Sequence, residues 1–99
     1  MLFRIMLPLC IAMLAVNVST AAAPAKAPLC KACHGEKGNK PLMDGYPKLA
    51  GQNKGYLVQA LKAYRDGLRQ GGQSAVMTAQ AKALSDEEIE ALADYYAKQ

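Results

Sequence analysis

The chain has few of the residues that build metal clusters and β-sheets. Its 99 residues include no tryptophan, one phenylalanine, one histidine and three cysteines. A structural zinc site needs four ligands, and beyond residue 25 the chain offers only Cys30, Cys33 and His34 as cysteine or histidine ligands. That part of the chain also lacks a run of four or more β-branched or aromatic residues in a period of two. We therefore expect neither a zinc-stabilised domain nor a β-sheet, and the fold class should be all-α.

Long apolar runs and basic clusters are also scarce. The longest apolar stretch, residues 5–18, contains Pro8 and Asn17, and its ~14 residues are too few to span the ~30 Å hydrocarbon core of a bilayer comfortably. The lysines are spaced singly, without a basic cluster that alternates with stacking aromatic residues. A retained membrane anchor is therefore the weaker alternative for this stretch, and we expect no binding of nucleic acid.

The first residues have the order of a secretory signal. A short basic segment is followed by the apolar stretch and then by small residues. The small residues allow cleavage near Ala22 or Ala23, so we expect residues 1–22 to be a signal peptide and residues 23–99 to form the functional domain. Cys10 would be removed with the signal. The mature protein should then be exported to the periplasm.

The mature domain is so small that it needs stabilisation beyond its own apolar core, such as a disulfide or a cofactor. A domain of about 75 residues rarely builds a core that is sufficient by itself. Its two cysteines, Cys30 and Cys33, lie so close in sequence that a disulfide between them would close too small a loop to staple the whole domain. A large apolar cofactor would complete the core better.

The first half of the mature chain predicts two helices joined by a loop. A short helix over residues 28–34 should end at Gly35, which is well placed as a C-terminal cap. The segment 35–53 holds too many glycines and prolines for a helix and should wrap as a loop. Apolar residues at helical spacing then predict a helix over 53–66 with Asn53 as its N-cap.

The second half predicts a loop and two further helices. Residues 68–76 are polar and glycine-containing, and a short helical stretch over 78–83 should follow them. Ser85 and Glu88 form a capping box, and apolar residues then fall on one face of a helix over 86–98. This last helix is the clearest structural signal in the chain.

The residues with a chemical function lie in one short segment, CKACH (30–34). Its spacing is that of covalent haem c attachment, because two thiols one helical turn apart can reach the two vinyl groups on one porphyrin edge while the imidazole lies under the iron. We expect Cys30 and Cys33 to bind one haem c covalently and His34 to be the proximal iron ligand. A thioredoxin-type redox pair is the weaker interpretation, because that pair lies in a βαβ context that this sequence lacks.

The sixth iron ligand should be a methionine. Of the two methionines beyond residue 25, Met77 is far enough from His34 for the chain to pass round the haem, whereas Met43 lies close to the proximal side. A thioether ligand favours the ferrous state, which suits an electron carrier. We therefore predict Met77 as the distal ligand, with core filling as the alternative. A distal ligand argues against a gas-binding or peroxidase-like site, which needs an open sixth position.

The loop over 35–53 should also support the proximal histidine. A proline carbonyl there could accept the Nδ1–H of His34 and fix its tautomer. We prefer Pro47 over Pro41, the alternative for Pro47 being a rigid turn without contact to the haem. The tyrosines of the two long helices are expected to pack in the core or at the haem edge: Tyr56, Tyr64, Tyr95 and Tyr96.

Positive charge is concentrated in the first part of the mature chain. Residues 26–69 contain nine basic and three acidic residues, whereas residues 85–99 contain five acidic residues and one lysine. This asymmetry favours oriented docking to an acidic partner, although a merely solubilising surface explains it equally well. Four lysines could surround the haem edge and steer the encounter: Lys31, Lys37, Lys48 and Lys54.

Four segments resemble the class I c-type cytochromes, and in particular short monohaem c553-like proteins that are similar to one half of the dihaem cytochrome c4. They are CKACHGEKGN (30–39), YPKLAGQ (46–52), YLVQALKAYRDG (56–67) and MTAQAKALSDEEIEALADYYA (77–97). The resemblance implies three to four helices wrapped around one covalently bound haem, with the terminal helices crossing beside it. It also implies axial ligands at His34 and Met77 and support from Pro47. The short segment before Cys30 departs from the pattern and puts the size of the helix crossing in doubt.

The resemblance implies a function in electron transport and no enzyme activity or small-molecule substrate. The protein would transfer single electrons between redox partners of a bacterial-type respiratory chain, such as membrane complexes, oxidases or reductases. The alternative is a small cytochrome subunit of a periplasmic dehydrogenase complex, for example one that oxidises sulfide or sulfite. Because cytochrome c4 carries two such domains and this chain has one, either a monomer or a homodimer is compatible with the sequence.

Overall fold

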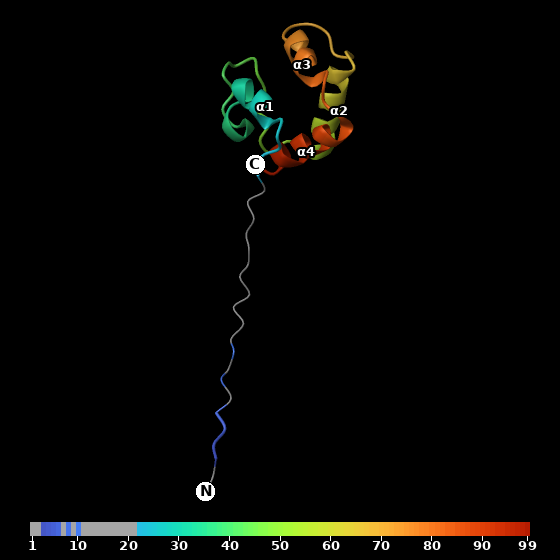
Figure 1. Cartoon of the computed structure of the whole chain (residues 1–99). Coiled ribbons are helices and arrows are strands. Elements are labelled where there is room, and N and C mark those ends of the chain that lie inside the picture. The colour runs from blue at the N-terminus through green and yellow to red at the C-terminus, as the bar shows by residue number, and fades with distance from the viewer. Residues whose placement is uncertain (1–2, 7, 9, 11–21) are drawn as a thin grey trace.

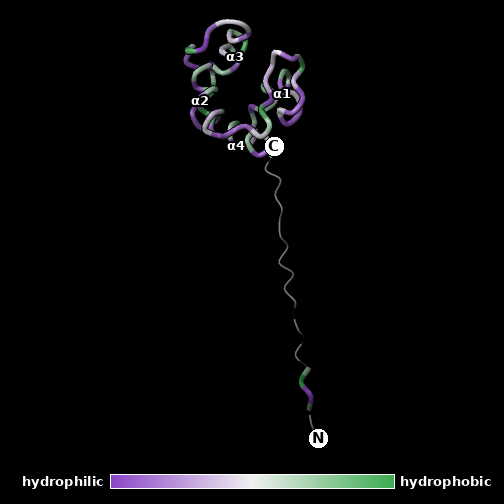
Figure 2. Tube along the Cα trace, turned by 180° about the vertical axis from the view of Figure 1, so that it is seen from behind, coloured by the Kyte–Doolittle hydropathy of each residue, from purple (hydrophilic) through white to green (hydrophobic). Residues whose placement is uncertain are grey.

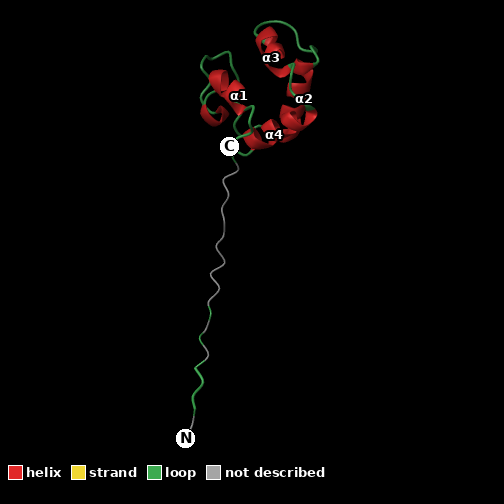
Figure 3. Cartoon of the chain, viewed as in Figure 1, coloured by secondary structure: helices red, strands yellow, loops and turns green. Residues whose placement is uncertain are grey.

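A computed structural model describes residues 3–6, 8, 10 and 22–99 of the chain. Its elements follow one another as α1 (Ala27–His34), the 3-10 turn η1 (Glu36–Gly38), α2 (Lys54–Arg65), α3 (Ser74–Ala81) and α4 (Asp86–Ala97). The described part of the chain contains helices and loops but no strand (Figure 3), which confirms the predicted all-α class. Most of the expected signal peptide, residues 1–22, lies outside the described residues. Among the described helices, none has the length and apolar character required to cross a membrane.

The helices form an open ring. In Figure 1, α1 lies on one side, α2 and α3 lie on the other, and α4 joins the two sides. The view from behind in Figure 2 shows the same arrangement. α2 packs extensively on both α3 and α4. The ring therefore has two walls, one built by α1 and one by the α2–α3 pair.

The protein core lies where α4 meets α2. Ile89 and Leu92 of α4 are fully buried, and Leu57 of α2 is 6% exposed. The apolar residues of α4 recur three and four positions apart, so they share one helix face and pack against one neighbour. This confirms the face that the sequence predicted for the last helix. A core of this size is small, as expected for a domain that is completed by a cofactor.

The two terminal helices of the domain meet through one tyrosine. Tyr96 near the end of α4 is 3% exposed, and its hydroxyl donates a weak hydrogen bond to the carbonyl of Ala27 in α1 at 3.5 Å. The Tyr96 carbonyl accepts a hydrogen bond from the N–H of Gly51 at 3.0 Å. Tyr96 thus ties α1, α4 and the loop before α2 together, so that even a short α1 is held in place.

Both predicted helix caps that depend on local chemistry are present. In α4, Ser85 Oγ accepts from the Glu88 N–H at 3.1 Å, and Glu88 Oε1 accepts from the Ser85 N–H at 3.1 Å. After α1, Gly35 adopts φ +84°, and a side chain there would overlap the carbonyl of Lys40. Asn53 is the N-cap residue of α2 as expected, although its side chain makes no capping hydrogen bond.

The third helix differs from the prediction. α3 spans Ser74–Ala81, whereas the sequence predicted helix over 78–83 and loop over 68–76. Gly71 and Gly72 adopt φ +90° and +52°, and the Ser74 N–H donates to the Gly71 carbonyl at 3.0 Å. This tight glycine turn lets the helix begin earlier than the composition of the loop suggested. Met77 therefore lies within a helix and not at the end of a loop.

Candidate haem site

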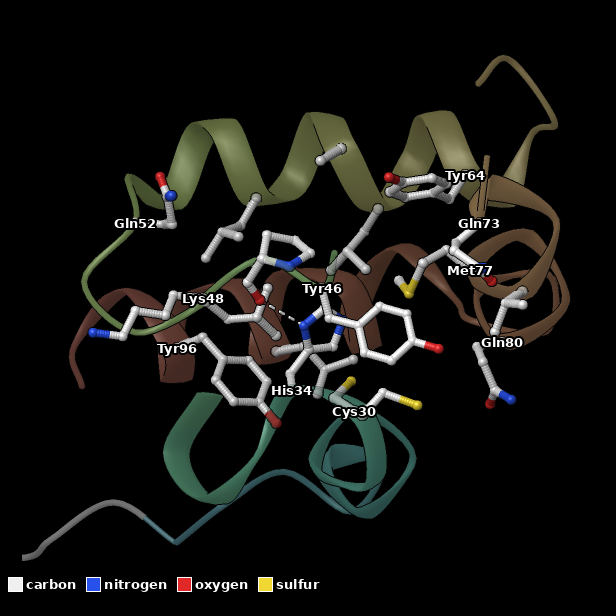
Figure 4. A pocket seen from close by; sticks show the side chains of 18 of the residues that line it. Cys30, His34, Tyr46, Lys48, Gln52, Tyr64, Gln73, Met77, Gln80 and Tyr96 are labelled. Atoms are coloured by element: carbon white, nitrogen blue, oxygen red, sulfur yellow. Dashed lines mark hydrogen bonds between the residues drawn. The ribbon is translucent and has the colours of Figure 1, made fainter. Parts of the chain in front are cut away.

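The ring encloses a cavity of about 270 Å³. Protein interiors normally hold few voids larger than one water, whose share of liquid volume is about 30 Å³. The walls are mainly apolar and come from α1, the loop before α2, α2, α3 and α4 (Figure 4). A space of this size and character suits a large apolar cofactor.

Helix α1 places three chemical groups on the cavity wall. Cys30, Cys33 and His34 all line it, because positions three and four apart in a helix share a face. Both cysteines are free thiols and half-buried, and His34 is buried. Burial raises the pKa of the Cys30 thiol, and a hydrogen bond with Tyr96 opposes this only partly.

The orientation of His34 is fixed by the loop before α2. Its Nδ1 lies 2.8 Å from the carbonyl oxygen of Pro47 (dashed line in Figure 4). A carbonyl can only accept, so Nδ1 carries the hydrogen, and Nε2 is the ring nitrogen that is left to bind a metal. The ring of Tyr46 lies 6.3 Å from the His34 ring, tilted by 51°. His34 is thus held in the orientation of a metal ligand.

Met77 approaches the cavity from the other wall. It lies on α3, and in Figure 4 its sulfur points into the cavity across from His34. Met43 is 49% exposed, and it is not among the residues that line the cavity. The structure thus brings Met77, and not Met43, to the same cavity as the CKACH segment.

One group at the cavity was not singled out from the sequence. Arg69 lies just beyond α2, and its guanidinium is 4.9 Å from the centre of the Tyr64 ring. It donates hydrogen bonds to the hydroxyls of Tyr64 at 3.1 Å and Tyr56 at 3.4 Å. These hydrogen bonds raise the pKa of Arg69, and the bond to Tyr56 contributes most. No sequence pattern points to this group, because Arg69 is in a loop and its partners are on a helix.

The lysines expected around the haem edge are not equally free. Lys31 pairs with Glu36 at 2.8 Å, and Lys54 pairs with Glu90 at 3.2 Å. Within the described part of the chain, Lys37 and Lys48 form no ion pair. Exposed pairs are weak, but they reduce the local potential. Of the four lysines expected at the haem edge, Lys37 and Lys48 are therefore the two whose positive charge is not paired.

The residues present fit the haem that the CKACH pattern predicts. Two thiols, an oriented imidazole and a thioether face one apolar cavity, and these are donors that haem c attachment and axial ligation require. Among the described residues, no group of three or more histidine, cysteine or acidic side chains could hold a bare metal ion. The two thiols, the imidazole and the thioether therefore suit an iron carried by a porphyrin.

Comparison with known proteins places the chain in a family. The sequence model of the cytochrome c family matches residues 21–98. Cytochrome c-554(548) of Halomonas halodenitrificans is 51% identical over 70 residues, which are 71% of this chain and 83% of that protein. The thiosulfate dehydrogenase electron acceptor of Thiomonas intermedia is 45% identical over 84 residues, 85% of this chain and 37% of that protein. Cytochrome c4 of Pseudomonas aeruginosa is 42% identical over 79 residues, 80% of this chain and 37% of that protein.

These relatives differ in how much of their length the chain covers. It spans most of cytochrome c-554(548) but little more than a third of the thiosulfate dehydrogenase electron acceptor and of cytochrome c4. The family match itself extends over the whole helical domain. The predicted resemblance to the class I c-type cytochromes is confirmed. The chain belongs to the cytochrome c family, and it is a c-type cytochrome that binds one haem c covalently and carries electrons between redox proteins, rather than an enzyme.

Proposed function

We propose that Cys30 and Cys33 hold the haem through two thioether bonds and that His34 and Met77 are its two axial ligands. One observation carries this assignment. The two thiols, the imidazole and the Met77 sulfur line a single cavity, with α1 on one wall and α3 on the other. A site with two protein ligands leaves no open coordination position, which suits electron transfer and not ligand binding.

Each of these side chains has a defined task in an electron carrier. When bound, the haem iron supplies a one-electron couple. The Pro47 carbonyl accepts the Nδ1–H of His34, so that Nε2 would be the nitrogen left to bind the iron. The Met77 thioether is a soft ligand and favours the reduced state. Leu57 and Leu92 line the cavity with apolar side chains that would keep water away from the haem.

The partners should be acidic redox proteins that bind weakly. Lys37 and Lys48 are free to steer such partners, and steering raises the association rate more than the affinity. We place the protein in the periplasm, because residues 1–22 have the order of a signal peptide that is cleaved near Ala22 or Ala23. Membrane complexes, oxidases and reductases of a respiratory chain are the proposed partners. The protein would act as a monomer or a homodimer.

A second function is favoured by one of the relatives. The Thiomonas protein accepts electrons from thiosulfate dehydrogenase according to its name, so this chain could serve as the small cytochrome subunit of a dehydrogenase complex. Copurification of a larger catalytic chain with this protein would favour the subunit, and purification of the cytochrome alone would favour the free carrier.

The ligand assignment is tested by absorption spectroscopy on protein produced with haem-maturation machinery. Haem that resists acid extraction is covalently attached. The sulfur-to-iron band of the ferric protein should be lost in Met77→Ala and kept in Met43→Ala, whose side chain does not line the cavity. Absence of the haem refutes the whole proposal. Attached haem that lacks the band and readily binds carbon monoxide would make a ligand-binding function the better assignment.

A further inference from the structure

The cluster of Arg69, Tyr56 and Tyr64 at the cavity is rich in hydrogen-bond donors. A guanidinium has five N–H donors and no acceptor. Arg69 uses one N–H on each tyrosine, and both phenolic oxygens act as acceptors in these bonds. Each tyrosine O–H therefore remains free to donate, and so do the remaining guanidinium hydrogens. A cavity wall with free donors and a positive charge is suited to an anion.

The charge of Arg69 is not neutralised by the protein. Within the described residues Arg69 forms no ion pair, although it is close in sequence to an arginine that does. That arginine, Arg65, binds Asp86 at 2.6 Å and Asp66 at 3.1 Å, and it does not line the cavity. The two residues are thus a matched pair: one arginine with its own carboxylates and one that faces the cavity without any.

The cluster lies on the wall opposite the thiols. Tyr56 and Tyr64 are on α2, whereas Cys30 and Cys33 are on α1, across the ring (Figure 1). Figure 4 shows Tyr64 at α2 on the far side of the cavity from Cys30. Haem carries its vinyl groups on one side of the porphyrin and its two carboxylate side chains on the other. If the vinyl side is held at α1, the carboxylate side faces away from α1.

We propose that Arg69, together with the hydroxyls of Tyr56 and Tyr64, binds a carboxylate side chain of the haem. The proposal rests on the assignment of Cys30 and Cys33 as the attachment points, because they set the direction of the porphyrin. Arg69 is then a positioning residue. It fixes the haem edge farthest from the thioethers and places a positive charge near the iron. The tyrosines orient the guanidinium and add donors of their own.

The variant Arg69→Gln removes the positive charge and the paired N–H donors of the guanidinium but keeps a polar side chain. The control is Arg65→Gln. Resonance Raman spectra of the two holoproteins report the bending vibration of the haem carboxylates, which responds to hydrogen bonding. We expect this band to shift in Arg69→Gln and to stay in place in Arg65→Gln. The midpoint potential should fall more in Arg69→Gln, because the haem carboxylate would lose its compensating positive charge, and an uncompensated negative charge favours the oxidised iron. Arg69→Lys, which keeps the charge without the paired N–H donors, should restore most of the potential but not the band.

The outcomes separate this inference from the assignment on which it rests. If the wild-type protein holds its haem and shows the sulfur-to-iron band, but the carboxylate band is identical in Arg69→Gln and Arg65→Gln, the Arg69 site is refuted and the axial ligands stand. Wild-type protein without attached haem refutes both. Should Arg69→Gln fail to fold, Tyr56→Phe removes one donor at a half-exposed position, and an unshifted carboxylate band in that variant and in Tyr64→Phe overturns the proposal.

Discussion

Replacement of Gly38 by alanine should be one of the most damaging single-methyl additions in the domain. Gly38 is buried at the end of η1 with φ +69°, and an added Cβ would lie 2.8 Å from Leu49 Cβ and 2.9 Å from Tyr96 Cδ1. The backbone cannot easily yield, because the Gly38 carbonyl accepts hydrogen bonds from the N–H groups of Leu49 at 2.9 Å and Ala50 at 3.2 Å. The new methyl group would therefore press on the tyrosine that joins α1 to α4.

The expected loss of stability has two parts. The left-handed backbone conformation costs a residue with a Cβ about 1–2 kcal/mol. Overpacking of a filled site adds about 1–3 kcal/mol. The total of roughly 2–5 kcal/mol is a large share of the ~5–15 kcal/mol that stabilises a typical domain. Each kcal/mol lowers the melting temperature of a domain of this size by about 4–8 °C, so a fall of at least ~8 °C is expected.

Two other glycines separate these contributions. Gly67 has φ +70° but no atom within 4 Å of an added Cβ, so Gly67→Ala carries the backbone cost alone. Gly45 has neither a positive φ nor a close neighbour, so Gly45→Ala should be nearly neutral. Urea unfolding of the holoproteins, followed by far-ultraviolet circular dichroism, gives the three free energies of unfolding. If Gly38→Ala is no less stable than Gly67→Ala, the packing around Tyr96 is wrong.

Three further changes test the C-terminal helix. Ser85→Ala removes the side-chain cap of α4 and should lower the free energy of unfolding by about 1 kcal/mol, whereas Ser85→Asp should retain most of it, as measured by urea unfolding. The hydrogen bond from the Ser85 backbone lowers the pKa of Glu88 in the folded protein. Ionised Glu88 therefore stabilises the fold above the pKa that it has in the unfolded chain, and this stabilisation is lost as the pH falls through the lower pKa of the folded protein. Melting temperatures recorded across the acid range should therefore depend less on pH in Glu88→Gln. Ile89→Ala empties a fully buried position and should cost about 2–5 kcal/mol, against about 0.5–1.5 kcal/mol for Ile89→Val; equal losses would contradict a tightly packed core.

Features that depend on neighbours in sequence were predictable from the sequence. The α4 helix follows from a capping box and an apolar period, both of which act within a few residues. The placement of Cys30, Cys33 and His34 on one face follows from helix geometry alone. The position of Gly35 as the stop of α1 was also predictable, although the overlap with the Lys40 carbonyl that enforces glycine there became visible only in the fold.

Loop conformations and contacts between different elements required the tertiary structure. The start of α3 is set by the turn at Gly71 and Gly72, whose conformation composition does not specify. The Arg69 cluster joins a loop to α2, and the pairing of Lys54 with Glu90 joins α2 to α4. Local sequence thus determined which residues can bind haem and form helices. The packing of α2 with α4 and with the loop after α2 decided which charges are paired and which donors face the cavity, because these contacts join different elements of the fold.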